Sequence, residues 1–254
     1  MVFTAGEAAQ PDQPIDLPCG KCEGCRFDKS RDWGLRCYHE SLLYDQSGFI
    51  TLTYDDDHLP TDGLLAPDHL RQFIKDAREL LGVQKLRYFS CGEYGEETRR
   101  PHYHLITFGL DWRSEKDKVV NMDGGFNAHL LQEIWDKGHN TCYNLSPGGC
   151  FYVAGYETKK KGDPDTFTSM SRNIAKVWVE ENWHEMLVTG CARIADRQYP
   201  VPNKYLEWMP EWAAQELRER RQRAAQGSYL DKQQSRYAKN SEFKSPWRQP
   251  KGQV

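Results

Sequence analysis

Residues 85–110 read KLRYFSCGEYGEETRRPHYHLITFGL, and this stretch decides the fold. Its two ends, residues 85–91 and 103–110, are rich in β-branched and aromatic side chains, which is typical of strands. The polar segment GEYGEETRRPH joins them. We therefore expect two strands of one antiparallel sheet, connected by a loop.

The segments on either side alternate between strand and helix patterns. Residues 48–54 (GFITLTY) and 140–145 (NTCYNL) predict strands, whereas residues 67–81 and 126–137 predict helices. The order β-α-β-β-α-β is that of a ferredoxin-like fold, an α+β arrangement with an antiparallel sheet. A further helix is expected over residues 150–161.

We divide the chain into a loose lead-in, a core domain and a basic, partly helical tail, at residues 1–18, 19–205 and 206–254. The domain begins with a cysteine-rich segment, residues 19–37, and a helix is expected over residues 26–43. Residues 166–205 carry no pattern that predicts an element.

The total charge excludes a broadly basic surface of the kind that coats nucleic acid. The chain has 34 Lys and Arg against 37 Asp and Glu, a net charge of −3. The charge is uneven, because residues 1–210 hold 24 basic and 32 acidic side chains and residues 211–254 hold 10 and 5. Any positive surface for DNA must therefore be local.

The sequence predicts a cytoplasmic protein that does not enter a membrane. No run approaches the roughly 18 apolar residues of a membrane span. The opening MVFTAGEAAQPDQPID lacks the basic and apolar regions of a secretory signal. Eight cysteines are too few for a disulfide scaffold of this size, and a reducing compartment is expected.

His102 and His104 are candidate metal ligands. One residue separates them on a predicted strand, so both imidazoles lie on one face of the sheet and Tyr103 on the other. Glu93 closes the preceding strand and is a candidate third ligand. Two histidines and a carboxylate suit Mg²⁺ or Mn²⁺ and leave positions open for substrate oxygens. The alternative is a chance pair on a half-buried strand.

The segment YVAGYETKKK (152–161) is the second candidate site. On a helix Tyr152 and Tyr156 share one face, and Lys159 lies on nearly the same face. A cation near a phenol favours the phenolate, so the set could supply nucleophiles for attack on a phosphodiester. Lys160, one residue round the helix, is the reserve cation. The alternative is a packing stripe of two tyrosines.

Three cysteines, Cys19, Cys22 and Cys25, are spaced two residues apart, and Cys37 offers a fourth thiol. The four could hold a structural zinc ion. A [4Fe–4S] run would need its fourth cysteine where Lys29 stands, which argues against an iron–sulfur cluster. The alternative is a set of reduced thiols in a turn.

Arg99 and Arg100 flank the HxH strand and are candidate contacts for DNA phosphates, together with Lys160. Solvated loop charges are the alternative.

In this order, the motifs resemble those of the HUH endonuclease superfamily, named for His–hydrophobic–His. The chain is most similar to replication initiators of small single-stranded DNA phages of the microvirus group, particularly gokushoviruses. The resemblance covers residues 14–205, through PCGKCEGCR, FITLTYDDDHLP, GEYGEETRRPHYH, YVAGYETKK and SMSRNI. Tyr103 departs from the pattern, because the middle HUH position is often aliphatic.

The resemblance implies that residues 19–205 are an HUH nuclease domain in which Glu93, His102 and His104 hold the metal. It implies that Tyr152 or Tyr156 attacks a phosphate, forms a 5′-phosphotyrosine link and frees a 3′-OH. The implied activity is that of a site-specific single-stranded DNA endonuclease and strand transferase, which initiates and terminates rolling-circle replication.

The implied partners are single-stranded DNA at a replication origin and the host helicase and polymerase, in the cytoplasm of an infected bacterium. The implied cofactor is Mg²⁺ or Mn²⁺, with structural Zn²⁺ if the cysteines bind it. A relaxase or transposase of the same superfamily is the first alternative. A zinc-stabilised DNA-binding module without catalysis is the second.

Overall fold

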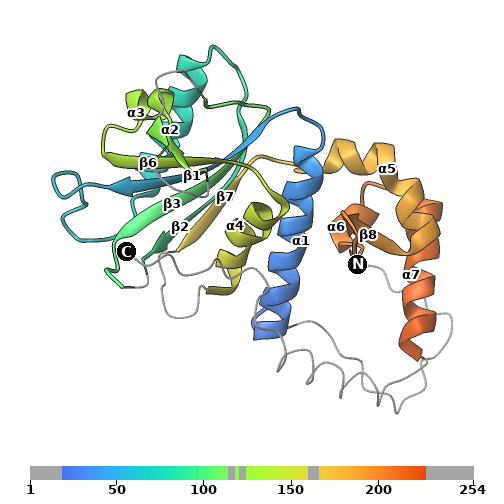
Figure 1. Ribbon diagram of the computed structural model, residues 1–254. Helices are drawn as coiled ribbons and strands as arrows, with labels where there is room; N and C mark the ends of the chain where they lie inside the picture. The colour runs from blue at the N-terminus through green and yellow to red at the C-terminus, as the bar shows by residue number, and fades with distance from the viewer. Residues whose placement is uncertain (1–18, 96, 114–117, 120–123, 160–165, 227–254) are drawn as a thin grey trace.

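The computed structural model describes residues 19–95, 97–113, 118–119, 124–159 and 166–226, without the side chains of residues 118–119, 157–159 and 225–226. Within these ranges seven strands form one antiparallel sheet in the order β4-β5-β6-β1-β3-β2-β7 (Figure 1). The central strands β1, β2, β3 and β6 are Ser47–Tyr54, Arg87–Tyr94, Pro101–Phe108 and Gly138–Asn144. The flanking strands β4, β5 and β7 are Lys118–Val119, Phe126–Asn127 and Phe167–Met170.

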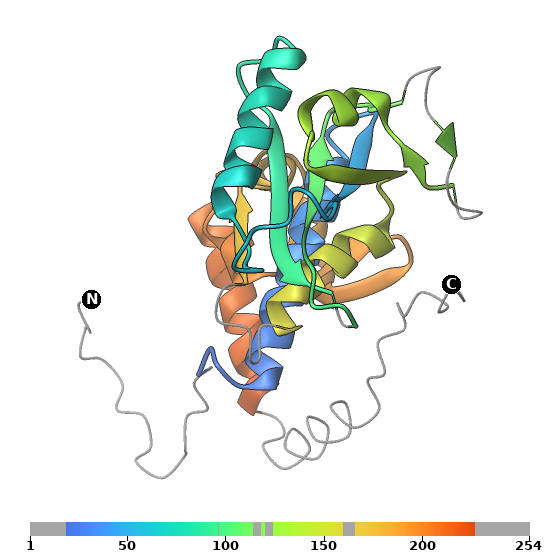
Figure 2. The same ribbon diagram turned by 90° about the vertical axis from the view of Figure 1, so that its left-hand side faces the viewer.

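Helices cover both faces of the sheet. Helices α2 (Pro67–Leu80) and α3 (His129–Ile134) pack on one face, and α1 (Glu23–Ser41) and α4 (Pro147–Lys159) on the other. Figure 2 shows α2 alongside the sheet. The chain order β1-α2-β2-β3-α3-β6 and the strand order β6-β1-β3-β2 are those of a ferredoxin-like fold. The predicted α+β, ferredoxin-like class is confirmed.

Side chains alternate between the two faces along β3. Tyr103 and Leu105 belong to the apolar cluster under α2 and α3, whereas Ile106 and Phe108 belong to the cluster under α1 and α4. All four are at most 3% exposed. The sheet is thus apolar on both faces near its centre, and polar groups there must serve a purpose beyond packing.

The predicted helix over residues 126–137 is wrong at both ends, since α3 is limited to six residues. Phe126 instead pairs with Cys142 of β6 as part of β5. The side-chain oxygen of Asn140, which is 1% exposed, accepts a hydrogen bond from the backbone N–H of Ala128 at 2.9 Å. This bond holds the chain against β6 where the periodicity predicts a helical turn.

Strand β6 begins at Gly138, where only glycine fits. Its φ is +145°, and a Cβ atom there would lie 2.4 Å from both Asp55 N and Thr53 O. Both atoms are backbone atoms at the end of β1, so they cannot move aside as a flexible side chain would. The close pairing of β6 with β1 depends on the missing side chain.

Residues 176–226 add α5, β8, β9, α6 and α7, at Lys176–Thr189, Cys191–Ile194, Arg197–Pro200, Asn203–Leu206 and Glu211–Gln226. Their apolar side chains form a third cluster, to which α1 contributes Leu35. In Figure 1, α1 lies between this group and the sheet with α4. Ala214 and Leu217 of α7 belong to the cluster, so this part of the predicted tail packs against the rest of the protein. No helix in the described part of the chain is long and apolar enough to cross a membrane.

A buried ion pair ties α1 to β2 and to the start of α5. Glu40, 1% exposed, accepts hydrogen bonds from the guanidinium of Arg87 and from the N–H of Ala175. Arg87 also donates to the carbonyl oxygens of Arg172 and Asn173, both at 3.2 Å. Asn173 and Ala175 have φ of 56° and 70°, and these bonds hold that left-handed turn in place.

His39 of α1 makes a second polar contact to the C-terminal helices. Its Nε2–H donates to the carbonyl of Arg193 at 2.9 Å, and its Nδ1 accepts from the hydroxyl of Tyr205 at 2.7 Å. The ring stacks on Trp178 with 3.7 Å between centroids. Burial outweighs the bond to Arg193 and lowers the pKa of His39 from 6.5 to about 4.

We predict that His39 makes the protein less stable in acid. Between pH 6.5 and pH 4 the unfolded chain binds a proton that the folded chain does not, so stability is lost as the pH falls. The depressed pKa of His39 corresponds to about 3 kcal/mol of unfolding free energy. Urea unfolding across this range should show about that much more loss for the wild type than for His39→Gln. Equal losses in the two proteins would contradict the prediction.

Candidate functional site

Glu93, His102 and His104 meet on the sheet face that α1 and α4 cover. The β2–β3 register places Glu93 directly across from His102, with His104 two residues further along the same face. Glu93 Oε1 lies 2.8 Å from His102 Nε2 and 3.1 Å from His104 Nε2. The structure thus brings together the three residues that the sequence singled out as metal ligands.

Both imidazoles are held by a second partner through Nδ1. His102 Nδ1 lies 3.1 Å from the carbonyl oxygen of Arg100, and His104 Nδ1 lies 3.0 Å from Thr51 Oγ1. Because a carbonyl oxygen only accepts, His102 must carry a proton on Nδ1. Metal-ligating histidines are held in this way by their other ring nitrogen, which leaves Nε2 for the ion.

The donor set fits a divalent cation. In neutral His102 the Nε2 lone pair faces the carboxylate of Glu93, which is repulsive unless a proton or a cation lies between them. One ligand atom from each of the three side chains lies within 4.8 Å of the others. Two imidazoles with one carboxylate leave coordination positions open, and such sets bind ions such as Mg²⁺ and Mn²⁺.

Glu93 is an anion at neutral pH. Burial raises the pKa of this carboxyl, but the hydrogen bonds with His102 and His104 outweigh burial and lower the pKa to about 2. The negative charge that a cation needs is therefore present in the folded protein.

Helix α4 places both predicted tyrosines against His104. The Tyr156 ring stacks on the imidazole with 4.9 Å between centroids and 4° between planes, and the Tyr152 ring meets it edge-on at 5.7 Å. The exposed fraction is 38% for Tyr152 and 3% for Tyr156. Burial, followed by the charge of Glu93, raises the pKa of Tyr156.

Helix α1 fixes the position of α4. A Cβ atom on Gly34 would lie 2.6 Å from the Phe151 ring, so the two helices approach closely at this glycine. Cys150 and Val153 of α4 are fully buried in one apolar cluster with Cys37 of α1. These contacts set the rotation of α4 and thereby direct its tyrosines towards the sheet.

The predicted lysines fall outside the described residues. Lys159 ends α4, but its side chain is not among those described, and Lys160 lies in the undescribed range 160–165. Their roles beside a phenolate and beside DNA stay predictions.

The two predicted DNA-contacting arginines differ in their surroundings. The guanidinium of Arg99 is exposed and lies 5.0 Å from the centre of the Tyr94 ring. Arg100 donates to the carbonyl of Tyr54 at 3.1 Å and forms an ion pair with Asp56 at 2.6 Å. Contacts of either residue with DNA stay predictions, and Arg100 has the further role of presenting its carbonyl to His102.

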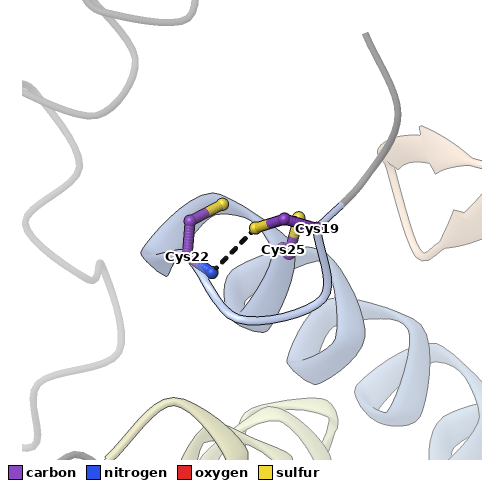
Figure 3. A group of neighbouring side chains, drawn as sticks. All are labelled: Cys19, Cys22 and Cys25. Atoms are coloured by element: carbon purple, nitrogen blue, oxygen red, sulfur yellow. Dashed lines mark hydrogen bonds between the residues drawn. The ribbon is translucent and has the colours of Figure 1, made fainter.

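The cysteine-rich segment forms a second cluster at the start of α1 (Figure 3). The thiol sulfurs of Cys19, Cys22 and Cys25 lie within 4.8 Å of one another. Cys37 is not part of this group, so the predicted four-cysteine site is wrong in its fourth member. Helix α1 carries Cys37 about 18 Å along its axis from Cys25, at about 1.5 Å per residue, into the core beside α4.

Two residues of β1 at the site were not predicted from the sequence. Thr51 bonds to His104, and the Phe49 ring lies 5.8 Å from the ring of His104 and 5.9 Å from that of Tyr152. Their alternation in GFITLTY signals a shared face. The signal that would have identified them is the β1–β3 register, which sets Thr51 opposite His104.

The chain is similar to replication-associated proteins of phages. The family model described as replication-associated protein ORF2 matches residues 47–161, from the start of β1 to just past α4. The replication-associated protein VP4 of Bdellovibrio phage phiMH2K is 30% identical over 227 residues, which cover 82% of this chain and 72% of that protein. The replication-associated protein ORF2 of Spiroplasma virus 4 is 30% identical over 246 residues, 85% of this chain and 76% of that protein. No solved structure shows a significant match to the chain.

We predict that Thr51→Val weakens Mn²⁺ binding about 10- to 100-fold, the usual effect of removing a partner that orients a metal-ligating histidine. Titration calorimetry measures the affinity. The matched control is Thr53→Val, on the same strand face but opposite His102, which should bind Mn²⁺ like the wild type. Unchanged affinity in Thr51→Val would contradict the role assigned to this hydroxyl.

Proposed function

Because the chain belongs to the family of phage replication-associated proteins, we propose that it nicks and rejoins single-stranded DNA to initiate and terminate rolling-circle replication. The reaction is a metal-dependent transesterification with a tyrosine nucleophile. Its intermediate is a 5′-phosphotyrosine link, formed together with a free 3′-OH.

One observation carries this proposal: both phenol rings contact a histidine of the metal-binding cluster. Tyr152 and Tyr156 pack against the ring of His104, while Nε2 of the same ring faces Glu93. A phosphate drawn to the cluster would therefore meet phenol oxygens in the same place. Holding nucleophile and phosphate together in this way removes much of the entropic barrier to attack.

The residues of the cluster have distinct tasks. Glu93, His102 and His104 would hold a Mg²⁺ or Mn²⁺ ion, which when bound neutralises the scissile phosphate and makes its phosphorus more electrophilic. The attacking tyrosine loses its phenol proton as the oxygen–phosphorus bond forms. The 3′ oxygen leaves with the electron pair of the broken bond and takes up a proton. Because the phosphodiester energy stays in the tyrosyl link, attack by a 3′-OH reseals the strand without ATP.

The first cleavage belongs to Tyr152, and the later strand transfer to Tyr156. The phenol of Tyr152 is open to a strand arriving from solution, whereas Tyr156 is stacked against His104 and 3% exposed. Tyr156 can reach a phosphate only after the neighbouring ring moves, since the two rings are 5.2 Å apart. Attachment of DNA to Tyr152 would provide that movement.

The proposed substrate is single-stranded DNA at a replication origin, in the cytoplasm of an infected bacterium. The freed 3′-OH would prime a host polymerase working with a host helicase. The lysines after α4, Arg99 and Arg100 would contact the DNA backbone. A relaxase or transposase could use the same cluster, but the relatives named as replication-associated favour an initiator. A non-catalytic DNA-binding module would not need two tyrosines against a metal-ligating histidine.

We predict that Tyr152→Phe lowers formation of the first covalent DNA adduct by roughly three orders of magnitude or more, because a nucleophile is lost. Tyr156→Phe should still form this adduct but fail to release a closed product. The assay incubates the full chain with origin-type single-stranded DNA and Mn²⁺ and locates the adduct by peptide mass spectrometry.

The double variant Tyr152→Phe, Tyr156→Phe is the control for this assay. It should form no adduct while binding Mn²⁺ with the affinity of the wild type. Covalent DNA on the double variant would overturn the tyrosine mechanism. An initial adduct shared equally between the two positions would overturn only the order of attack.

We predict that His102→Ala abolishes Mn²⁺-dependent nicking and that EDTA does the same to the wild type, because a ligand or the ion itself is removed. Gel analysis of cleaved oligonucleotide measures the rate. His129→Ala changes an exposed histidine on α3, across the sheet from the cluster, and should nick normally. Full activity of the wild type in EDTA would exclude the metal role.

A further inference from the structure

The cysteine cluster lies apart from the proposed nuclease site. Its three members precede β1, outside the residues 47–161 that the family model matches. All three are free thiols, with Cys19 and Cys22 exposed and Cys25 half-buried. The proposed cleavage reaction uses none of them, so their convergence needs a separate explanation.

The sulfur positions are close to those of a thiolate metal site. Cys19 Sγ lies 4.0 Å from Cys25 Sγ, and all three sulfurs fall within 4.8 Å of one another. Tetrahedral zinc with Zn–S bonds of about 2.3 Å places its sulfurs about 3.8 Å apart. A disulfide would need about 2.05 Å between sulfurs. The observed spacing therefore needs a contraction of an ångström or less to surround one ion.

The backbone supports negative charge at this cluster. The N–H of Cys22 points to Cys19 Sγ at 3.2 Å, a contact drawn as a dashed line in Figure 3. Cys22 is the N-cap of α1, and Cys25 lies in the first turn of that 19-residue helix. Backbone N–H donors and the positive end of a helix both favour thiolates, which are the form that binds metals.

We propose that Cys19, Cys22 and Cys25 bind one zinc ion through three thiolates. Thiolates are soft ligands and select zinc over the Mg²⁺ or Mn²⁺ that the carboxylate and imidazole cluster suits, so the two sites differ in the metal they take. Among the described residues no fourth His, Cys, Asp or Glu joins the three sulfurs. The fourth coordination position is therefore left to water or another exchangeable ligand.

The bound ion would brace the start of α1. It would link residue 19 to the first helical turn, where the N–H of Arg26 already bonds to the carbonyl of Cys22 at 3.0 Å. Helix α1 in turn packs on α4, the helix of the tyrosines. The site is thus structural and has no role in bond cleavage.

The test is metal analysis of the full chain, purified under reducing conditions, with Co²⁺ as the spectroscopic probe. Elemental analysis should find one equivalent of zinc that Cys22→Ser loses and that His102→Ala keeps. Co²⁺ should give a sulfur-to-metal charge-transfer band in the wild type and in His102→Ala, but not in Cys22→Ser. The matched control is Cys191→Ser, a half-buried cysteine of β8, which should keep both zinc and the band.

Three results would overturn the proposal. They are a wild type without the charge-transfer band, a band that persists in Cys22→Ser, and iron with inorganic sulfide in place of zinc. Circular dichroism of Cys22→Ser should show a folded protein, since Cys22 belongs to none of the apolar clusters. Adduct formation on tyrosine is measured separately, so failure of the zinc site leaves the proposed nicking activity untouched.

Discussion

The pleat of β3 is the constraint on which the rest of the structure depends. The strand is paired on both sides, with β1 and with β2, so its residues cannot shift by one position without reversing both faces. One face receives Tyr103, whose hydroxyl donates to the carbonyl of Ala66 and lies 2.8 Å from the hydroxyl of Tyr54. The other face receives His102 and His104. The buried tyrosine thus keeps the histidines in register from the opposite side of the sheet.

Helix α1 connects the site to the rest of the molecule. It contacts α4 through a glycine, β2 through the buried pair of Glu40 and Arg87, and the C-terminal helices through His39. A buried carboxylate that lost either partner would stay charged in a low-dielectric environment, at a cost of several kcal/mol. The C-terminal helices are therefore coupled to the position of the tyrosines although they contribute none of the cluster's side chains.

Local signals explain which parts of the fold and site the sequence predicted. A period of two identified β3 and its histidines, and a spacing of four identified the tyrosine face of α4. The failures involve contacts between residues far apart in sequence. Asn140 shortens α3, Glu40 and Arg87 hold the left-handed turn before α5, and the β1–β3 pairing selects Thr51. Cys37 shows the same limit, because its spacing fits a zinc ligand but its helix carries it into the core.

The charge distribution suits a protein that holds its DNA through a covalent bond. Binding by phosphate contacts alone loses affinity steeply as salt rises, and it needs many basic side chains, whereas this chain has a net charge of −3. In the proposed reaction the phosphotyrosine bond keeps the 5′ end attached at any salt concentration. Non-covalent affinity then has only to bring one phosphate to the cluster, where Glu93 supplies the charge that holds a cation. Once the strand is resealed, little electrostatic attraction remains, and the weakly charged surface favours release of the product.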